Sequence, residues 1–295
     1  MPYKQAEDKT EIHYSDWGTG VPVVLIHGWP LTSVMWEKQA EFLASNGVRV
    51  ITYDRRGFGL SGQPWSGYDY DTFASDLNVL METLDLRGAV LVGFSMGGGE
   101  VARYLGRYGS SRVSKAVLIS SVTPYLLQAP DNPDGIEAEE FQKIEDALLT
   151  DRPDFLKDFG AKFYNRSLMN HSVSDAVLQW NQNVCLTASL HSTVAAAKAW
   201  SSTDFRADLR KITVPTLVIH GTSDQTVPIE KSAHKAVQLL KNAILREYEG
   251  EPHGLFLTAA DELNNDLLEF IQTGGVPTLD PQAAETAFTS AVLSQ

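Results

Sequence analysis

The first half of the chain alternates short apolar runs with segments in which apolar residues recur at helical spacing. An alternating stretch at 11–17 is followed by apolar runs at 21–26, 48–54, 90–94 and 115–120. Continuous apolar runs of this length are typical of strands buried on both faces, and the helical spacing between them favours crossover helices. The pattern therefore predicts an α/β fold with a mostly parallel central sheet flanked by helices.

The alternation stops after 115–120. Helical stretches follow around 137–149, 153–164 and 175–187, and strands resume at 214–220 and 243–248, with helices at 229–240 and 261–271. A helical segment of this length predicts an all-helical lid, inserted after the sixth strand and lying over the carboxyl ends of the sheet. We therefore divide the chain into a core of 1–122 and 202–273, a lid of 123–201, and a tail of 274–295 that is either a short helix or a disordered end.

Composition narrows the class of protein. The 295 residues are 43% hydrophobic and carry a formal net charge of −13. Nucleic acid and anionic membranes require basic surfaces, so neither is expected as a partner. No apolar window has the length of a membrane span and no apolar leader precedes the first strand, so we expect a cytoplasmic protein. The single cysteine, Cys185, excludes an intramolecular disulfide and is expected to be a small buried hydrophobe.

A serine stands where one apolar run passes into a helix. Gly93 and Gly97 lie two residues on either side of Ser95, which gives the pattern G-x-S-x-G. Between a strand and a helix this pattern is typical of a tight turn that exposes a nucleophilic hydroxyl. The glycines fit neither the dinucleotide-binding nor the phosphate-loop pattern. We interpret Ser95 as a nucleophile.

A serine hydroxyl needs a general base, and the base needs a carboxylate that fixes its tautomer. Asp224 follows the predicted strand at 214–220, and His253 follows the strand at 243–248. The order Ser95, Asp224, His253 is that of the α/β-hydrolase class. Loops that leave parallel strands at the same sheet edge can converge, so we predict these three residues as a catalytic triad.

The other histidines are expected to have different roles. His27 precedes a glycine and is interpreted as a structural hydrogen-bonding residue, and His220 is expected to be buried at a strand end. The histidines lack the H-x-x-x-H and H-E-x-x-H spacings of metal sites. We therefore predict no metal and no cofactor.

The oxyanion that forms in acyl transfer needs two N–H donors. The backbone N–H of Met96 follows the nucleophile, and that of Trp29 lies in the loop after the strand at 21–26. We predict these two groups as the oxyanion hole.

Pro30 restricts the backbone of Trp29. We therefore expect it to fix the direction in which the Trp29 carbonyl points. The substrate pocket is expected to be lined by Trp29, Pro30, Phe94, Val122, Trp200, Val227 and Leu255.

Taken together, the motifs resemble those of a known family. They are His27-Gly28-Trp29-Pro30, the glycine-rich segment from Tyr53 to Ser61, Gly93 to Glu100, Gly221 to Asp224, and Pro252-His253-Gly254. Over residues 11–272 the chain is similar to the cofactor-free (non-haem) haloperoxidase and aryl esterase branch of the α/β-hydrolases. The resemblance implies an acyl-enzyme on Ser95, hydrolysis of small or aryl esters, perhydrolysis of carboxylates with hydrogen peroxide, and a homo-oligomer. We expect the Trp29 carbonyl, directed by Pro30, to accept a hydrogen bond from the peroxide and so to favour perhydrolysis.

Other functions stay open at this stage. The substrate could be an ester, a carboxylate or a lactam, since some relatives are described as γ-lactamases. A non-catalytic ligand receptor could also use this scaffold. A serine-reactive fluorophosphonate together with a general ester distinguishes the receptor, because a receptor should turn over esters very slowly.

Overall fold

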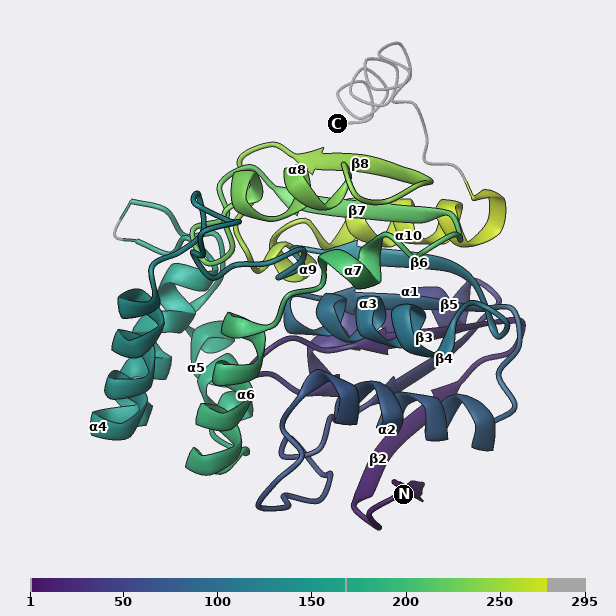
Figure 1. Ribbon diagram of the computed structural model, residues 1–295, viewed down its shortest axis with the longest axis horizontal. Helices are drawn as coiled ribbons and strands as arrows, with labels where there is room; N and C mark the ends of the chain where they lie inside the picture. Colours follow the sequence, from purple (N-terminus) through teal and green to yellow (C-terminus); the bar gives the residue numbers. More distant parts are fainter. Residues whose placement is uncertain (1, 168, 275–295) are drawn as a thin grey trace, which may run out of the picture.

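A single eight-stranded sheet forms the centre of the computed structural model, which describes residues 2–167 and 169–274 (Figure 1). The strands lie in the order β1-β2-β4-β3-β5-β6-β7-β8. They are β1 (Tyr3–Gln5), β2 (Glu11–Trp17), β3 (Val21–Ile26), β4 (Val48–Tyr53), β5 (Ala89–Phe94), β6 (Val113–Ile119), β7 (Thr216–Gly221) and β8 (Ala243–Tyr248). β2 pairs antiparallel with β1 and β4, and the remaining neighbours are parallel. The predicted mostly parallel sheet is confirmed.

The register brings the carboxyl ends of the central strands to one edge. Ile26 of β3 pairs with Gly93 of β5, and Phe94 pairs with Ile119 of β6. Ile119 in turn pairs with Ile219 of β7. The residues that follow these strands therefore emerge side by side, which is where ligands bind in open α/β sheets.

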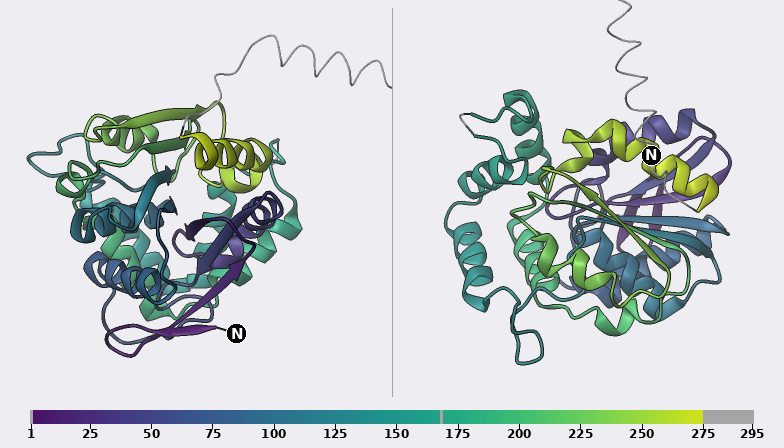
Figure 2. Two further views of the ribbon diagram at one scale, coloured as in Figure 1. Left: turned by 90° about the vertical axis from the view of Figure 1, so that its right-hand side faces the viewer. Right: turned by 90° about the horizontal axis from the view of Figure 1, so that it is seen from above.

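Helices cover both faces of the sheet (Figures 1 and 2). On one face α2 and α3 pack together and α3 contacts α7, and on the other α1 packs against α10. The helices of the core are η1 (Ser33–Trp36), α1 (Glu37–Ser45), α2 (Tyr70–Thr83), α3 (Met96–Tyr108), α7 (Arg206–Leu209), η2 (Ile229–Lys231), α8 (Ala233–Ala236), α9 (Leu255–Thr258) and α10 (Ala260–Thr273). The sheet is thus buried on both faces, as its continuous apolar runs require.

Three further helices form an insertion between β6 and β7, at one end of the sheet (Figure 1). They are α4 (Ala138–Phe163), α5 (Asp175–Cys185) and α6 (Leu190–Ser202), and α4 packs against the other two. The backbone of α4 is interrupted at Asp151 (φ −151°, ψ 83°), whose carboxylate accepts a hydrogen bond from the Asp154 N–H. Two helices were expected here, and the structure joins them across this kink.

Three local predictions were wrong or incomplete. The strand β1 was missed because it is only three residues long and pairs with β2 alone. The helix α6 was missed because Ala, Ser and Thr fill most of its positions and blur the apolar spacing. The single helix expected at 229–240 is instead η2 and α8, separated by the non-helical Ser232 (φ −128°, ψ −93°). The tail prediction lies outside the described residues apart from Gly274, which caps α10.

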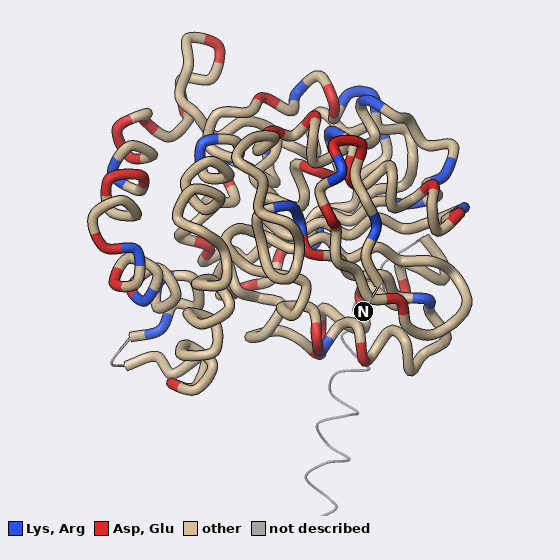
Figure 3. Tube along the Cα trace, turned by 90° about the horizontal axis from the view of Figure 1, so that it is seen from below, with Lys and Arg blue, Asp and Glu red and all other residues tan. Residues whose placement is uncertain are grey.

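Charged residues are spread over the molecule rather than gathered by sign (Figure 3). Within the described residues, no helix combines the length and apolarity needed to cross a membrane. Cys185 is buried, as expected for a small apolar side chain.

Candidate active site

Ser95 is the single residue between β5 and α3, and it forms a strained turn. Its backbone has φ 52° and ψ −115°, a conformation that residues other than glycine rarely adopt. Hydrogen bonds hold the turn from both sides, because the Ser95 N–H donates to the Ile119 carbonyl at 2.8 Å and the Ser95 carbonyl accepts from the Gly98 N–H at 3.0 Å. The turn therefore fixes the hydroxyl at the carboxyl end of β5.

The glycines of this turn are required by close backbone approach. A Cβ at Gly93 would collide with the carbonyl of Gly97, and a Cβ at Gly97 would collide with the carbonyl of Ile26. The turn thus packs directly on the end of β3, beside the loop that contains Trp29. Larger residues at either position would force these backbones apart.

The three predicted triad residues lie within hydrogen-bond distance of one another. Ser95 Oγ is 3.0 Å from His253 Nε2, and His253 Nδ1 is 2.6 Å from Asp224 Oδ2. With Nδ1–H donating to the carboxylate, Nε2 is free to accept the serine proton. All three side chains are at least nine-tenths buried. The arrangement matches the geometry of a serine nucleophile with its base and orienting acid.

Asp224 is held by both backbone and side-chain donors. Its Oδ1 accepts hydrogen bonds from the N–H groups of Thr226 and Val227 at 2.9 and 2.8 Å. His220 Nε2 lies 3.2 Å from Oδ2 and donates to the Val227 carbonyl at 2.8 Å. Burial raises the pKa of this carboxyl, but the charge of His253 and the hydrogen bonds of both histidines outweigh burial and hold the pKa well below its usual value. Asp224 is therefore ionised.

Aromatic rings surround the imidazole of His253. The ring of Phe94 lies 4.9 Å and that of Phe163 lies 4.8 Å from it, centroid to centroid. Both phenylalanines are fully buried or nearly so. They restrict the imidazole to the orientation in which it bridges Ser95 and Asp224, and they keep water from its faces.

The predicted oxyanion donors lie on adjoining backbone segments. Met96 is the first residue of α3, so its N–H has no acceptor within the helix, and the Ser95 side chain does not cap it. The loop of Trp29 packs against the nucleophile, since a Cβ at Gly28 would collide with the Phe94 ring and closely approach Ser95. Trp29 is itself fixed by its indole N–H, which donates to the Thr193 carbonyl in α6 at 2.9 Å. This arrangement is compatible with an oxyanion hole.

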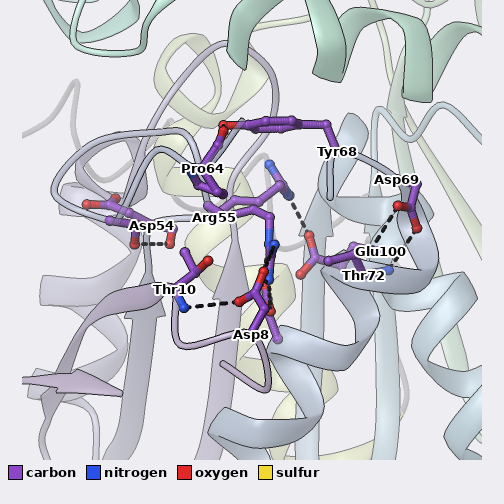
Figure 4. Close-up of polar contacts among 12 residues, drawn as sticks. Asp8, Thr10, Asp54, Arg55, Pro64, Tyr68, Asp69, Thr72 and Glu100 are labelled. Atoms are coloured by element: carbon purple, nitrogen blue, oxygen red, sulfur yellow. Dashed lines mark hydrogen bonds and ion pairs between the residues drawn. The ribbon is translucent and has the colours of Figure 1, made fainter. Parts of the chain in front are cut away.

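A buried polar network holds the Trp29 loop to α3, and Figure 4 shows its ion pair between Arg55 and Glu100. His27 Nδ1–H donates to the Gly28 carbonyl at 2.8 Å, while its Nε2 accepts from the Arg55 N–H at 2.9 Å. The Arg55 guanidinium donates to the His27 carbonyl at 2.9 Å and to Glu100 of α3 at 2.7 Å. Burial and the neighbouring Arg55 charge lower the pKa of His27 well below its usual value. His27 is therefore neutral and structural, as expected.

The next residue, Arg56, forms a separate ion-pair group that points away from the site. It donates to both carboxylate oxygens of Asp76 in α2 at 2.6 and 2.7 Å, and to Asp8 at 2.8 Å. Arg55 and Arg56 are both only 1% exposed. Two adjacent arginines thus stabilise different parts of the fold.

A small pocket opens above Ser95. The residues that line it are Trp29, Ser95, Val122, Phe159, Trp200, Thr226, Val227 and His253. Trp29, Val122, Trp200 and Val227 were predicted as pocket residues. The insertion contributes Phe159 and Trp200, and both rings pack against Trp29, at 5.5 and 5.7 Å between centroids.

Three predicted pocket residues lie elsewhere. Phe94 is fully buried beneath the site, where its ring packs against Trp36 and Phe256. Leu255 is fully buried in α9, and Pro30 is buried in the turn after Trp29, to which it is joined by a cis peptide bond. None of the three lines the pocket. The prediction was wrong because nearness in sequence to a site residue does not make a side chain point the same way. That Pro30 steers the Trp29 carbonyl stays a prediction.

A wider groove adjoins the pocket between α4, α6 and the residues before η2. Phe159, Trp200 and Thr226 line both spaces. The groove also includes the apolar side chains of Phe141 and Phe155 and the charged side chains of Glu140 and Lys162. These shared residues therefore separate the pocket from the groove.

Several residues of the site were missed from the sequence. Thr226 could have been found from its position two residues after the predicted acid. Phe159 lies in the predicted helix at 153–164 but was not predicted as a pocket residue. The Arg55–Glu100 pair gave no signal, because residues 45 positions apart show their pairing only once the strands are aligned. Among the described residues, no group of three or more His, Cys, Asp or Glu side chains is placed to hold a metal ion.

Fold and site geometry together define a hydrolase of the α/β class. The family described as alpha/beta hydrolase fold matches residues 21–260, so the chain belongs to this family. It is 46% identical over 276 residues to a non-heme haloperoxidase from Rhodococcus erythropolis, covering 92% of this chain and all of that protein. It is 42% identical over 278 residues to a bifunctional esterase/perhydrolase from Acinetobacter calcoaceticus, with the same coverage.

A crystal structure of bromoperoxidase from Bacillus anthracis superposes with a TM-score of 0.87 at 45% identity, covering 92% of this chain and 100% of that one. The predicted resemblance to the haloperoxidase and esterase branch is confirmed.

Proposed function

We propose that this protein is a serine esterase that acts on small or aryl esters through an acyl-enzyme on Ser95, and that it also catalyses perhydrolysis. The observation that carries this proposal is the hydrogen-bonded series Ser95, His253 and Asp224 at 3.0 and 2.6 Å. The names of the relatives support it, since they include a haloperoxidase and an esterase/perhydrolase.

The geometry accounts for each step. Ser95 Oγ attacks the ester carbonyl while His253 Nε2 takes its proton, and Asp224 stabilises the imidazolium that results. The N–H groups of Met96 and Trp29 donate to the oxyanion. His253 then returns the proton to the leaving alcohol, and the acyl-enzyme remains on Ser95.

The fate of the acyl-enzyme decides between the two activities. Water attacks it to give the carboxylic acid, with His253 accepting the proton and returning it to Ser95. Hydrogen peroxide attacks in the same way to give the peracid, so that carboxylic acid and peroxide yield peracid and water. The peracid then oxidises a halide ion in solution to the hypohalous acid and reverts to the carboxylic acid.

We further propose that the insertion acts as a lid. Phe159 and Trp200 support this role, because both come from the insertion and both line the pocket over Ser95. The homo-oligomeric state and the cytoplasmic location stay predictions.

The test compares hydrolysis of p-nitrophenyl acetate with formation of peracetic acid from acetate and peroxide. The variant Ser95→Ala should lose at least about 10³-fold in kcat for both, because the nucleophile is removed. Ser114→Ala is the matched control, since that serine is exposed on β6. Undiminished ester turnover in Ser95→Ala would overturn the mechanism. Fluorophosphonate labelling without turnover of either substrate would favour a receptor.

A further inference from the structure

Two residues that line the pocket each carry a buried polar atom without a partner. The two atoms are the indole Nε1 of Trp200 and the hydroxyl Oγ1 of Thr226, both of which are buried and neither of which bonds to any described residue. Both residues line the pocket that contains Ser95 and His253. Buried polar side-chain atoms are nearly always hydrogen-bonded, so two unpaired atoms on one small pocket call for a physical explanation.

The other polar groups of the pocket are already engaged. Ser95 Oγ and His253 bond to each other and to Asp224, and the Trp29 indole N–H donates to the Thr193 carbonyl. The rest of the wall is apolar. Among the described residues that line this pocket, Trp200 and Thr226 are therefore the ones that carry a side-chain donor without a partner.

Both atoms are shielded from solvent, although the residues that carry them are partly exposed. Trp200 and Thr226 are partly exposed overall and line the outer groove, yet Nε1 and Oγ1 are shielded from solvent. The backbone N–H of Thr226 is held by Asp224 Oδ1 at 2.9 Å, and the Trp200 ring is held against Trp29 and Phe141. The two donors are thus fixed by the elements that also position the site.

We propose that the pocket selects esters that carry an acceptor oxygen, as an ether, hydroxyl or carbonyl, a few bonds from the scissile carbonyl. This oxygen accepts hydrogen bonds from Trp200 Nε1–H and Thr226 Oγ1–H. The proposal rests on the esterase function proposed above and names its substrate class. A pocket built to bond such an oxygen disfavours the all-carbon analogue, because that analogue leaves both donors unpaired.

The test uses two pairs of substrates that differ only by an oxygen in place of a methylene. One pair varies the acyl part, as p-nitrophenyl methoxyacetate and p-nitrophenyl butyrate. The other varies the alcohol part, as 2-methoxyethyl acetate and butyl acetate. The readout is the ratio of kcat/KM for the ether ester to that for its all-carbon partner. Differences in intrinsic reactivity cancel when this ratio is compared between wild type and variant.

Four variants test whether this ratio depends on the two donors. Thr226→Val removes one donor at nearly constant shape, and Trp200→Phe removes the other while keeping an aromatic ring, although a smaller one. Each should lower the ratio for one substrate pair by about three- to tenfold. Thr226→Ser keeps the hydroxyl and should leave the ratio within about twofold of wild type. Trp36→Phe is the matched control, because the Trp36 N–H is also buried and unpaired but lies outside the pocket. It should not change the ratio.

The outcomes separate this proposal from the esterase function. If the esters are hydrolysed but neither ratio changes in Thr226→Val or Trp200→Phe, ordered water satisfies the two donors and the proposal is wrong, while the esterase function stands. If no ester is turned over, the esterase function fails. In that case the affinities for methoxyacetone and 2-pentanone, measured by NMR titration, still test whether the pocket prefers a ligand with an acceptor oxygen. Preference for the ether ketone that is lost in both variants supports the proposal, and equal binding overturns it.

Discussion

The two sides of the active site are built in different ways. On the core side, strand ends and buried hydrogen bonds fix Ser95, His253 and Asp224, and an ion pair between Arg55 and Glu100 holds the adjoining backbone. On the insertion side, the wall consists of partly exposed aromatic rings that pack on one another. The first side fixes the distances between the reacting groups, and the second fixes the shape of the pocket.

This difference indicates a division of labour. Chemistry depends on pre-organised donors and acceptors, which lose their effect when displaced slightly. Selection among esters depends on the volume and polarity of a pocket, where a methylene group changes rates only by about 10- to 200-fold. We therefore expect substitutions on the core side to lower kcat for every substrate, and substitutions on the insertion side to change which substrate is preferred.

The largest effect is expected at Asp224. Asp224→Asn leaves the shape of the site intact but removes the charge that stabilises protonated His253, and it favours the wrong imidazole tautomer. By analogy with serine proteases, kcat for p-nitrophenyl acetate should fall by about 10³- to 10⁴-fold. Initial rates at pH 7.5 measure this, and a loss below tenfold would show that the Asp224 carboxylate neither orients nor stabilises His253.

The adjacent arginines provide a more selective test of the core side. Arg55→Lys cannot reproduce the simultaneous bonds to Glu100 and the His27 carbonyl, so the Trp29 loop should shift relative to α3. We expect kcat to fall about 10- to 100-fold with KM nearly unchanged, because the oxyanion is stabilised only in the transition state.

Arg56→Lys is the matched control for that prediction. It disrupts an equally buried ion pair, with Asp76, that does not contact the Trp29 loop. Both variants should be destabilised by a few kcal/mol in urea unfolding. Equal losses of kcat in the two variants would show that Arg55 acts through stability alone.

A smaller effect is expected on the insertion side. Phe159→Ala enlarges the pocket without touching the triad, so kcat/KM for p-nitrophenyl octanoate relative to p-nitrophenyl acetate should rise by about three- to tenfold. The rate of fluorophosphonate labelling should stay within about threefold of wild type. A fall in labelling comparable to that of Arg55→Lys would contradict the division between the two sides.

The smallest effect concerns pH and the core side. His27 stays neutral in the folded state because its pKa is lowered, while in the unfolded chain it has an ordinary pKa near 6.5. Below that pH the unfolded state binds a proton that the folded state does not, so the free energy of unfolding falls by up to about 1.4 kcal/mol per pH unit. His27→Gln cannot take up this proton.

Urea unfolding at pH 7.5 and 5.5 measures this contribution. The variant should lose about 1 kcal/mol less than wild type over the interval. The same loss in both proteins would show that His27 is not the responsible group.

The sequence was informative wherever chemistry depends on a short segment. The G-x-S-x-G pattern located Ser95, and strand ends located Asp224 and His253, because parallel strands deliver their following loops to one edge. The strands β2 to β8 lie close to their predicted ranges, and the inner strands from β3 to β7 are apolar runs because they are buried on both faces.

Other features depend on contacts between distant segments. The pairing of Arg55 with Glu100 and the placement of Phe159 over Ser95 arise only when strands and helices are assembled. Phe94 is a residue that was predicted to line the pocket and does not. It precedes Ser95 directly in the sequence, but its side chain packs in the core. Side-chain direction at a strained turn cannot be read from spacing.

The insertion between β6 and β7 has a consequence for how this enzyme can be altered. Although β6 and β7 run parallel, the two ends of the insertion lie together, because the Phe205 N–H donates to the Pro124 carbonyl at 2.8 Å. A segment whose ends already lie together can be lengthened, shortened or exchanged at a small cost in loop-closure entropy. The insertion can therefore be exchanged as one unit. A family with this topology can acquire new substrates by replacing it while the sheet and its loops stay unchanged.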